Sequence, residues 1–120
     1  MSHILIVEDE EVLADSLQDI LLGEGHQVRT AYNGRAGLEE LARERVDLVL
    51  LDLMLPLLDG TSLLEVLRRD SPTTVVVVVT ACTRDILRGA AVEGFLRKPF
   101  SLDTLLNKVK SVLAVPVPAP

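Results

Sequence analysis

Four apolar runs in this sequence are each followed by polar residues of types that serve phosphoryl chemistry. Glu8 and Asp9 follow the first of these runs, and Asp52, Thr80 and Lys98 follow the others. A few carboxylates that leave coordination positions to water and phosphate suit Mg²⁺ better than a calcium site built wholly from protein. With the ion in place, an oxygen of Asp52 can attack phosphorus in line, while the metal, Lys98 and Thr80 share the three non-bridging oxygens.

The surroundings of Asp52 in the sequence are aliphatic. Residues 48–51 and Leu53 are all leucine or valine, so a solvated surface position is not expected for this carboxylate. If Asp52, Glu8 and Asp9 lie within several Å, they repel one another by on the order of 1 to 4 kcal/mol per close pair. A divalent cation relieves that repulsion, which is a second reason to predict Mg²⁺ here.

Each of these residues alone has a plainer interpretation. The acidic run 8–11 suits the positive end of a helix, and taken alone that is the better reading of it. Asp52 could cap a turn, Thr80 could satisfy a backbone group at a strand end, and Lys98 alone is most often a surface charge. The combination of four strand ends is what favours a site.

The elements that position these residues alternate between strands and helices. Continuous aliphatic runs without polar alternation are typical of strands buried on both faces. We predict three such strands and two weaker ones, over residues 4–7, 46–51 and 75–79, and over 27–31 and 94–96. Apolar residues at helical spacing lie between them: Leu13, Leu17, Ile20 and Leu21, then Leu38, Leu41 and Ala42, then Leu63, Leu64 and Leu67.

The clearest helix is the last one, with Ser101 as its N-cap and an apolar stripe from Leu102 to Leu113. Strand and helix alternate five times, which predicts one α/β domain over residues 1–114, a doubly wound parallel sheet with right-handed crossovers. Ligands of such sheets bind at the carboxyl ends of the strands. Residues 115–120, VPVPAP, are expected to form a proline-rich tail or linker stub.

Composition argues against several other functions. A net charge of -6 and only 2% aromatic residues oppose direct nucleic-acid binding. Cys82 is the only cysteine, so no internal disulfide forms, and with His3 and His26 it makes no zinc ligand cluster. No segment approaches the roughly 18 apolar residues needed to span a membrane, so a cytoplasmic protein without membrane contact is expected.

These residues resemble a response-regulator receiver domain, the chemotaxis-type fold of two-component signalling. The resemblance runs from Ile4 to Leu113 and depends on the motifs ILIVEDE, DLVLLDLMLPLLDG, VVVVVTA and FLRKPF. It implies a flavodoxin-like sheet of five parallel strands in the order 2-1-3-4-5. It also implies a regulatory phosphoacceptor rather than an enzyme, in which Asp52 receives a phosphoryl group from a sensor histidine kinase or a phosphotransfer protein.

The same resemblance implies a ligand set for the metal. Asp9, Asp52 and the carbonyl oxygen of Met54 would hold Mg²⁺, and Glu8 would help through water.

The resemblance also implies a conformational switch. Lys98 would contact the phosphate and precede a cis peptide bond at Pro99. Thr80 would move toward the phosphoryl group and Phe95 would follow it inward. This movement would control an output domain or an effector protein.

One segment departs from the family pattern. Between Thr80 and Lys98 the chain reads ACTRDILRGAAVEGFLR, about one helical turn shorter than is usual, and its apolar spacing supports at most two turns. We therefore predict a shortened fourth helix. In the family this helix, the fifth strand and the fifth helix commonly form the partner or homodimer surface, so a reduced version of that surface is expected here.

Other proteins with doubly wound sheets fit less well. A haloacid-dehalogenase-type phosphatase needs a second aspartate two residues after the nucleophile, where this chain has Met54. A flavodoxin-type flavin carrier needs a hydroxyl- and glycine-rich phosphate loop after the first strand, where this chain has EDEE. The remaining alternative is a receiver-like module that is not phosphorylated and acts by docking to other proteins.

Overall fold

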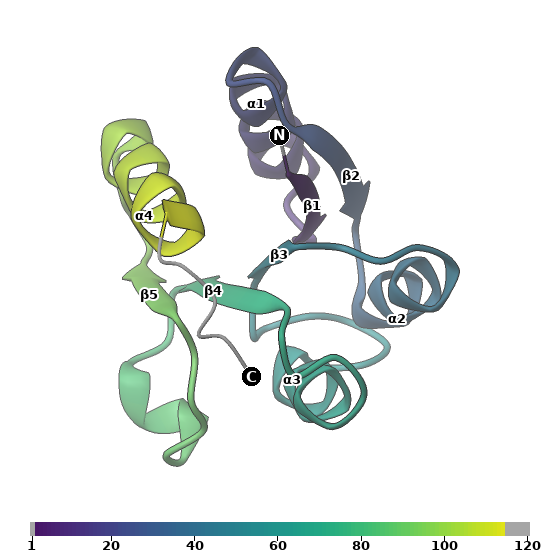
Figure 1. Ribbon diagram of the computed structural model, residues 1–120. Coiled ribbons are helices and arrows are strands. Elements are labelled where there is room, and N and C mark those ends of the chain that lie inside the picture. The colour runs from purple at the N-terminus through teal and green to yellow at the C-terminus, as the bar shows by residue number, and fades with distance from the viewer. Residues whose placement is uncertain (1, 115–120) are drawn as a thin grey trace.

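The computed structural model describes residues 2–114, and the predicted proline-rich tail at residues 115–120 lies outside the described residues. Five parallel strands form one sheet in the order β2-β1-β3-β4-β5 (Figure 1). The strands are β1 (His3–Val7), β2 (Gln27–Ala31), β3 (Leu48–Leu51), β4 (Val75–Thr80) and β5 (Gly94–Arg97). The helices are α1 (Glu11–Gly23), α2 (Gly34–Arg43), α3 (Gly60–Asp70), α4 (Leu102–Ala114) and the short 3₁₀ helix η1 (Arg84–Leu87).

The predicted sheet and its strand order are confirmed, and the largest difference in boundaries is at β3. This strand begins at Leu48, two residues later than the apolar run predicted. Val46 is buried, but its carbonyl oxygen accepts a hydrogen bond from the Thr74 hydroxyl at 3.2 Å. The Asp47 carboxylate accepts one from the backbone N–H of His3 at 2.8 Å. Val46 therefore packs in the core while lying outside the strand.

Helices cover both faces of the sheet. In Figure 1, α1 and α4 lie on one side and α2 and α3 on the other. Within β1, Leu5 and Val7 face the α2 and α3 side, whereas Ile4 and Ile6 face α1 and α4. A strand with two covered faces has no polar side, which explains why β1, β3 and β4 are continuous apolar runs, whereas the edge strand β2 alternates exposed and partly buried residues.

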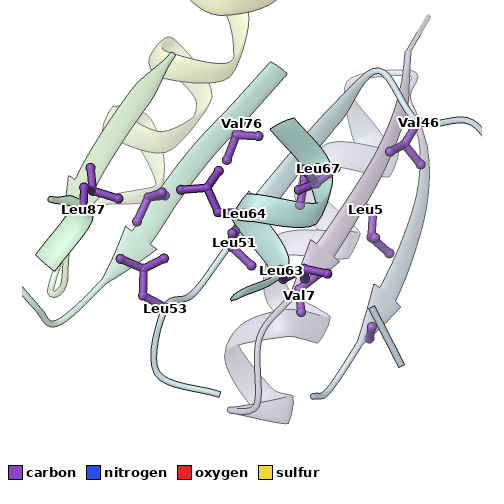
Figure 2. Packing of buried hydrophobic residues seen from close by; sticks show 13 residues of the cluster. Leu5, Val7, Val46, Leu51, Leu53, Leu63, Leu64, Leu67, Val76 and Leu87 are labelled. Atoms are coloured by element: carbon purple, nitrogen blue, oxygen red, sulfur yellow. The ribbon is translucent and has the colours of Figure 1, made fainter. Parts of the chain in front are cut away.

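The core on the α3 side is almost wholly aliphatic. Figure 2 shows Leu63, Leu64 and Leu67 of α3 among side chains of the sheet. Each of these three leucines is at most 3% exposed. Their spacing of three and four residues places them on one stripe of the helix, as the sequence predicted.

The connection from β4 to β5 contains no full helix, as predicted from its length. Its regular structure is the four-residue η1, and Leu87 is its buried side chain. The far end of the connection is held by Arg68 of α3, which donates to the carbonyl oxygen of Ala91 at 3.1 Å and pairs with Glu93 at 2.6 Å. Hydrogen bonds from the Arg68 side chain therefore attach the far end of the connection to α3. A longer helix would have been held by packing instead.

The sheet order creates a switch point between β1 and β3, because the chain leaves these neighbouring strands in opposite directions across the sheet. Val7 and Leu51 are paired in the β1–β3 register, so the residues after them emerge side by side. Polar groups just beyond this pair lie in the crevice where doubly wound sheets bind ligands.

Gly60, the first residue of α3, lets that helix begin directly against the strand end. A β-carbon at this position would lie 2.5 Å from the Cα of Leu53 and closer still to the carbonyl oxygen of Asp52. The backbone N–H of Gly60 donates to the carbonyl oxygen of Leu53 at 3.0 Å, which closes the loop that follows Asp52. A side chain here would displace the backbone of the candidate site.

We expect Gly60→Ala to lower the free energy of unfolding by about 1 to 3 kcal/mol, because the added methyl group meets backbone that has little room to move. Urea unfolding followed by circular dichroism measures this loss. Gly23→Ala is the matched control, since nothing lies within 4 Å of its β-carbon position at the end of α1. This control should be neutral or stabilising by up to about 1 kcal/mol. Equal unfolding midpoints for Gly60→Ala and wild type would contradict the steric account.

Candidate functional site

Three carboxylates gather at the edge of the sheet where β1 and β3 end. One oxygen from each of Glu8, Asp9 and Asp52 lies within 4.8 Å of the others. Glu8 and Asp52 are 0% and 3% exposed, whereas Asp9 is exposed. The fold thus brings together the three carboxylates that the sequence predicted to meet.

Lys98 supplies the positive charge of this cluster. Its Nζ lies 2.7 Å from Glu8 Oε1, 3.0 Å from Asp52 Oδ2 and 3.2 Å from Glu10 Oε1. One ammonium group therefore contacts three carboxylates, and it offsets only part of their mutual repulsion.

The environment of Glu8 disfavours its charged form. Its Oε2 accepts a hydrogen bond from the backbone N–H of Glu10 at 3.0 Å. Within residues 2–114 no hydrogen bond of normal geometry reaches its Oε1. Burial raises the pKa of Glu8 to about 7, outweighing the contacts with Lys98 and Glu10 that lower it. Burial alone would lower the pKa of Lys98, but Glu8 and Asp52 raise it above its ordinary range.

Both oxygens of the Asp52 carboxylate are engaged. Oδ1 accepts a hydrogen bond from the backbone N–H of Met54 at 3.0 Å, and Oδ2 accepts one from Lys98 Nζ at 3.0 Å. The backbone N–H of Asp52 donates to the carbonyl oxygen of Val7 at 3.0 Å, which ties it to the end of β1. The main chain and the lysine together fix the orientation of this carboxylate.

The loop after Asp52 forms the solvent side of the site. Met54 is 60% exposed and lines an open cavity together with Asp9 and Asp59. Its main chain lies beside the Asp52 carboxylate through the hydrogen bond from its N–H. That the carbonyl oxygen of Met54 binds the metal stays a prediction.

Thr80 and Lys98 meet at the ends of β4 and β5. Thr80 is fully buried, and its carbonyl oxygen accepts a hydrogen bond from the backbone N–H of Lys98 at 2.7 Å. Its Oγ1 accepts one from the backbone N–H of Cys82 at 3.4 Å. The peptide bond between Lys98 and Pro99 is cis, as the resemblance implied. Phe95 of β5 is half-buried and packs against the core on the α3 side.

The donor set fits Mg²⁺. Opposite oxygens around an octahedral Mg²⁺ are about 4.2 Å apart, because each Mg–O distance is about 2.1 Å. One carboxylate oxygen from each of Glu8, Asp9 and Asp52 lies within 4.8 Å of the others, and the cluster contains neither histidine nor cysteine.

Glu10 belongs to this cluster, although sequence reasoning assigned to it only a place at a helix end. It is the N-cap residue of α1, but its side chain makes no capping hydrogen bond. Instead its carboxylate contacts Lys98, which lies 88 positions further along the chain. The run EDEE holds more acidic residues than a helix N-terminus needs. Acidic residues at the start of a helix are ordinarily explained by the helix dipole, so the sequence alone did not indicate the contact with Lys98.

The fold and this edge define a flavodoxin-like α/β protein with an acidic pocket at the carboxyl ends of β1 and β3. Residues 4–110 match the family described as the response regulator receiver domain. Response regulator ArlR of Staphylococcus aureus is 34% identical over 116 residues, which cover 94% of this chain and 53% of ArlR. The chain therefore spans about half the length of the curated relatives it matches.

Solved structures agree with this family. A CheY-like receiver domain protein from Methanospirillum hungatei has a TM-score of 0.89 and 32% identity, covering 94% of both chains. Response regulator protein TrrA from Thermotoga maritima, solved in complex with Mg²⁺ and BeF, has a TM-score of 0.85 and 31% identity. That match covers 93% of this chain and 99% of TrrA.

The chain belongs to the response regulator receiver domain family. Receiver domains are the phosphoacceptor domains of two-component signalling. None of the helices within residues 2–114 is long and apolar enough to cross a membrane.

The raised pKa of Glu8 predicts a pH dependence of stability. The value is about 7 in the folded chain against 4.5 for an ordinary glutamate. Between these values the unfolded chain loses the Glu8 proton while the folded chain keeps it, so the free energy of unfolding falls as pH rises. In metal-free buffer the free energy of unfolding of the wild type should fall by on the order of 1 to 3 kcal/mol as the pH rises through this range. We expect this fall to be absent in Glu8→Gln.

Urea unfolding at several pH values between about 4.5 and about 8 measures this slope. Glu11→Gln is the control, because Glu11 is a neighbouring acid at the exposed start of α1, and it should keep the wild-type slope. A Glu8→Gln variant with the wild-type slope would show that burial of Glu8 is not the cause.

Proposed function

We propose that Asp52 accepts a phosphoryl group in a Mg²⁺-dependent reaction and that the phosphorylated domain controls an output. The observation that carries this proposal is the 3.0 Å contact between the buried Asp52 carboxylate and Lys98 Nζ, beside oxygens of Glu8 and Asp9. A carboxylate oriented by its main chain and surrounded by groups for a cation and for phosphate oxygens is equipped as a nucleophile toward phosphorus.

In the transfer, an oxygen of Asp52 forms a bond to phosphorus while the bond from phosphorus to the donor atom breaks. The donor, a phosphohistidine of a sensor kinase or of a phosphotransfer protein, leaves with that electron pair. Asp9, Asp52 and the carbonyl oxygen of Met54 would hold Mg²⁺, with Glu8 acting through water. Bound Mg²⁺ supplies positive charge to the phosphoryl oxygens.

Lys98 has a part on both sides of this reaction. Before transfer its ammonium group stabilises the charged Asp52 carboxylate at 3.0 Å. Transfer removes that charge and places about two negative charges on the phosphoryl oxygens, which Lys98 then contacts. Glu8 and Glu10 compete for the same ammonium group, so the new charge must draw Lys98 away from them.

The proposed switch uses Thr80 and Phe95. The Thr80 hydroxyl moves from its contact with Cys82 toward the phosphoryl group, and Phe95 follows inward. This movement changes the surface near η1 and β5 and so controls an output domain, an effector protein or assembly into a homodimer. The domain acts in the cytoplasm as a regulator and not as an enzyme on other substrates, and it makes no direct contact with nucleic acid or membrane.

Intact mass spectrometry after incubation with Mg²⁺ and acetyl phosphate, a small phosphodonor, tests this proposal. We expect a gain of one phosphoryl group that disappears without Mg²⁺ and in Asp52→Asn, because the nucleophile is then an amide. Asp19→Asn, at an exposed position on α1, should be phosphorylated like the wild type.

If neither acetyl phosphate modified the wild type nor beryllofluoride, a phosphoryl mimic, bound it in the presence of Mg²⁺, the phosphoacceptor proposal would be wrong. The chain would then be a receiver-like docking module that is not phosphorylated.

A further inference from the structure

The connection between β4 and β5 carries a contact that the phosphoryl site does not use. The guanidinium carbon of Arg84, the first residue of η1, lies 5.4 Å from the centroid of the Phe95 ring. A guanidinium group within about 6 Å of an aromatic centroid is attracted to the negative face of the ring. Among residues 2–114, no carboxylate lies within ion-pairing distance of Arg84, so the ring is its charge partner.

The Phe95 ring lies on the face of the sheet that carries Thr80. Phe95 is paired with Val78 in the β4–β5 register, and Thr80 is two residues further along β4. Side chains two residues apart on a strand point to the same face, so Thr80 and Val78 share a face. Val78 and Phe95 both pack in the core on the α3 side. Movement of the Phe95 ring along this face therefore changes its position relative to Thr80.

The Arg84 contact is one of several that attach the near half of the connection, where Arg97 also donates to the carbonyl oxygen of Ala81 at 3.4 Å and Leu87 is buried. The far end is fixed by the hydrogen bonds of Arg68 to Ala91 and Glu93. Between the two ends an open groove separates the connection from α3, lined by side chains that include Leu64 and Ile86. Phe95 is held by its pairing with Val78 and by the core on the α3 side, and the guanidinium group of Arg84 adds a contact with its ring.

We propose that Arg84 is a positioning residue that holds the Phe95 ring in the arrangement seen here and opposes its inward movement on phosphorylation. This inference rests on the proposed function and adds to it a residue that sets the balance between the two states. A guanidinium group held over the half-buried ring opposes movement of the ring away from it, so the contact stabilises the arrangement seen here. Removing the contact therefore shifts the domain toward its activated arrangement.

The expected shift is modest, because a cation–π contact at an exposed position is a weak interaction. Its loss should tighten the binding of an activating ligand by about two- to fivefold. The same change should appear as a larger population of the inward ring before any ligand is added.

Fluorine NMR of protein labelled with 4-fluorophenylalanine measures both effects. The sequence contains two phenylalanines, Phe95 and Phe100, and a Phe100→Leu variant assigns the two resonances. Beryllofluoride is titrated at fixed Mg²⁺ into the wild type, Arg84→Met and Arg84→Lys. Arg88→Met is the matched control, because it removes the same charge from an exposed residue just after η1.

We expect Arg84→Met to bind beryllofluoride about two- to fivefold more tightly than the wild type. Its Phe95 resonance without ligand should lie part of the way toward the bound position. Arg84→Lys should fall between the two, and Arg88→Met should match the wild type. A merely structural loss would not tighten the binding of beryllofluoride, so the affinity is the deciding readout.

Two results would overturn the inference, and they differ from failure of the proposed function. If the wild type binds beryllofluoride but Arg84→Met binds with equal or lower affinity, Arg84 does not oppose the switch. If Arg88→Met tightens binding as much as Arg84→Met, the effect comes from charge and not from the ring contact. A wild type that binds no beryllofluoride overturns the proposed function and this inference with it.

Discussion

The site depends on the repulsion among carboxylates that the sheet brings to one point, and on the single lysine that opposes it. Glu8 and Asp52 are buried beside each other because β1 and β3 are neighbours, and Asp9 lies beside them at the surface. Lys98 comes from β5 at the far edge of the sheet and passes the end of β4 to reach them. Burial with incomplete neutralisation raises the pKa of Glu8 to about 7. A divalent cation would supply the positive charge that this site lacks, and that charge would in turn allow an anionic phosphoryl group to bind.

The rest of the fold serves this placement. Parallel strands covered on both faces hold the strand ends in register, as the pairing of Val7 with Leu51 shows. Gly60 lets α3 start against the backbone of Asp52, so the loop that carries Met54 remains short and close. The connection from β4 to β5 departs most from a regular αβ unit, since one 3₁₀ turn and the contacts of Arg68 and Arg84 replace a packed helix. A conformational change at Thr80 would reach the protein surface at this connection.

Much of the fold was predictable from sequence because three strands are short aliphatic runs and polar residues follow four of the five strands at one edge of the sheet. That pattern located Glu8, Asp9, Asp52, Thr80 and Lys98, and the residue count before Lys98 predicted the shortened helix. The contact of Glu10 with Lys98 was not predictable, because local rules read an acid at a helix start as a capping or dipole interaction. Contacts across the fold, such as Arg84 with Phe95, depend on side-chain positions that no sequence period encodes.

The binding of Mg²⁺ to the unphosphorylated domain tests the central claim most directly, and differential scanning calorimetry at about pH 8 measures it through stability. The melting temperature of the wild type should rise with the logarithm of the Mg²⁺ concentration, because a ligand that binds only the folded state stabilises it by mass action. Asp9→Asn removes an exposed ligand without disturbing the core, so it should fold normally and lose most of this rise. A melting temperature that does not depend on Mg²⁺ would contradict the account, because Lys98 alone would then satisfy the carboxylates.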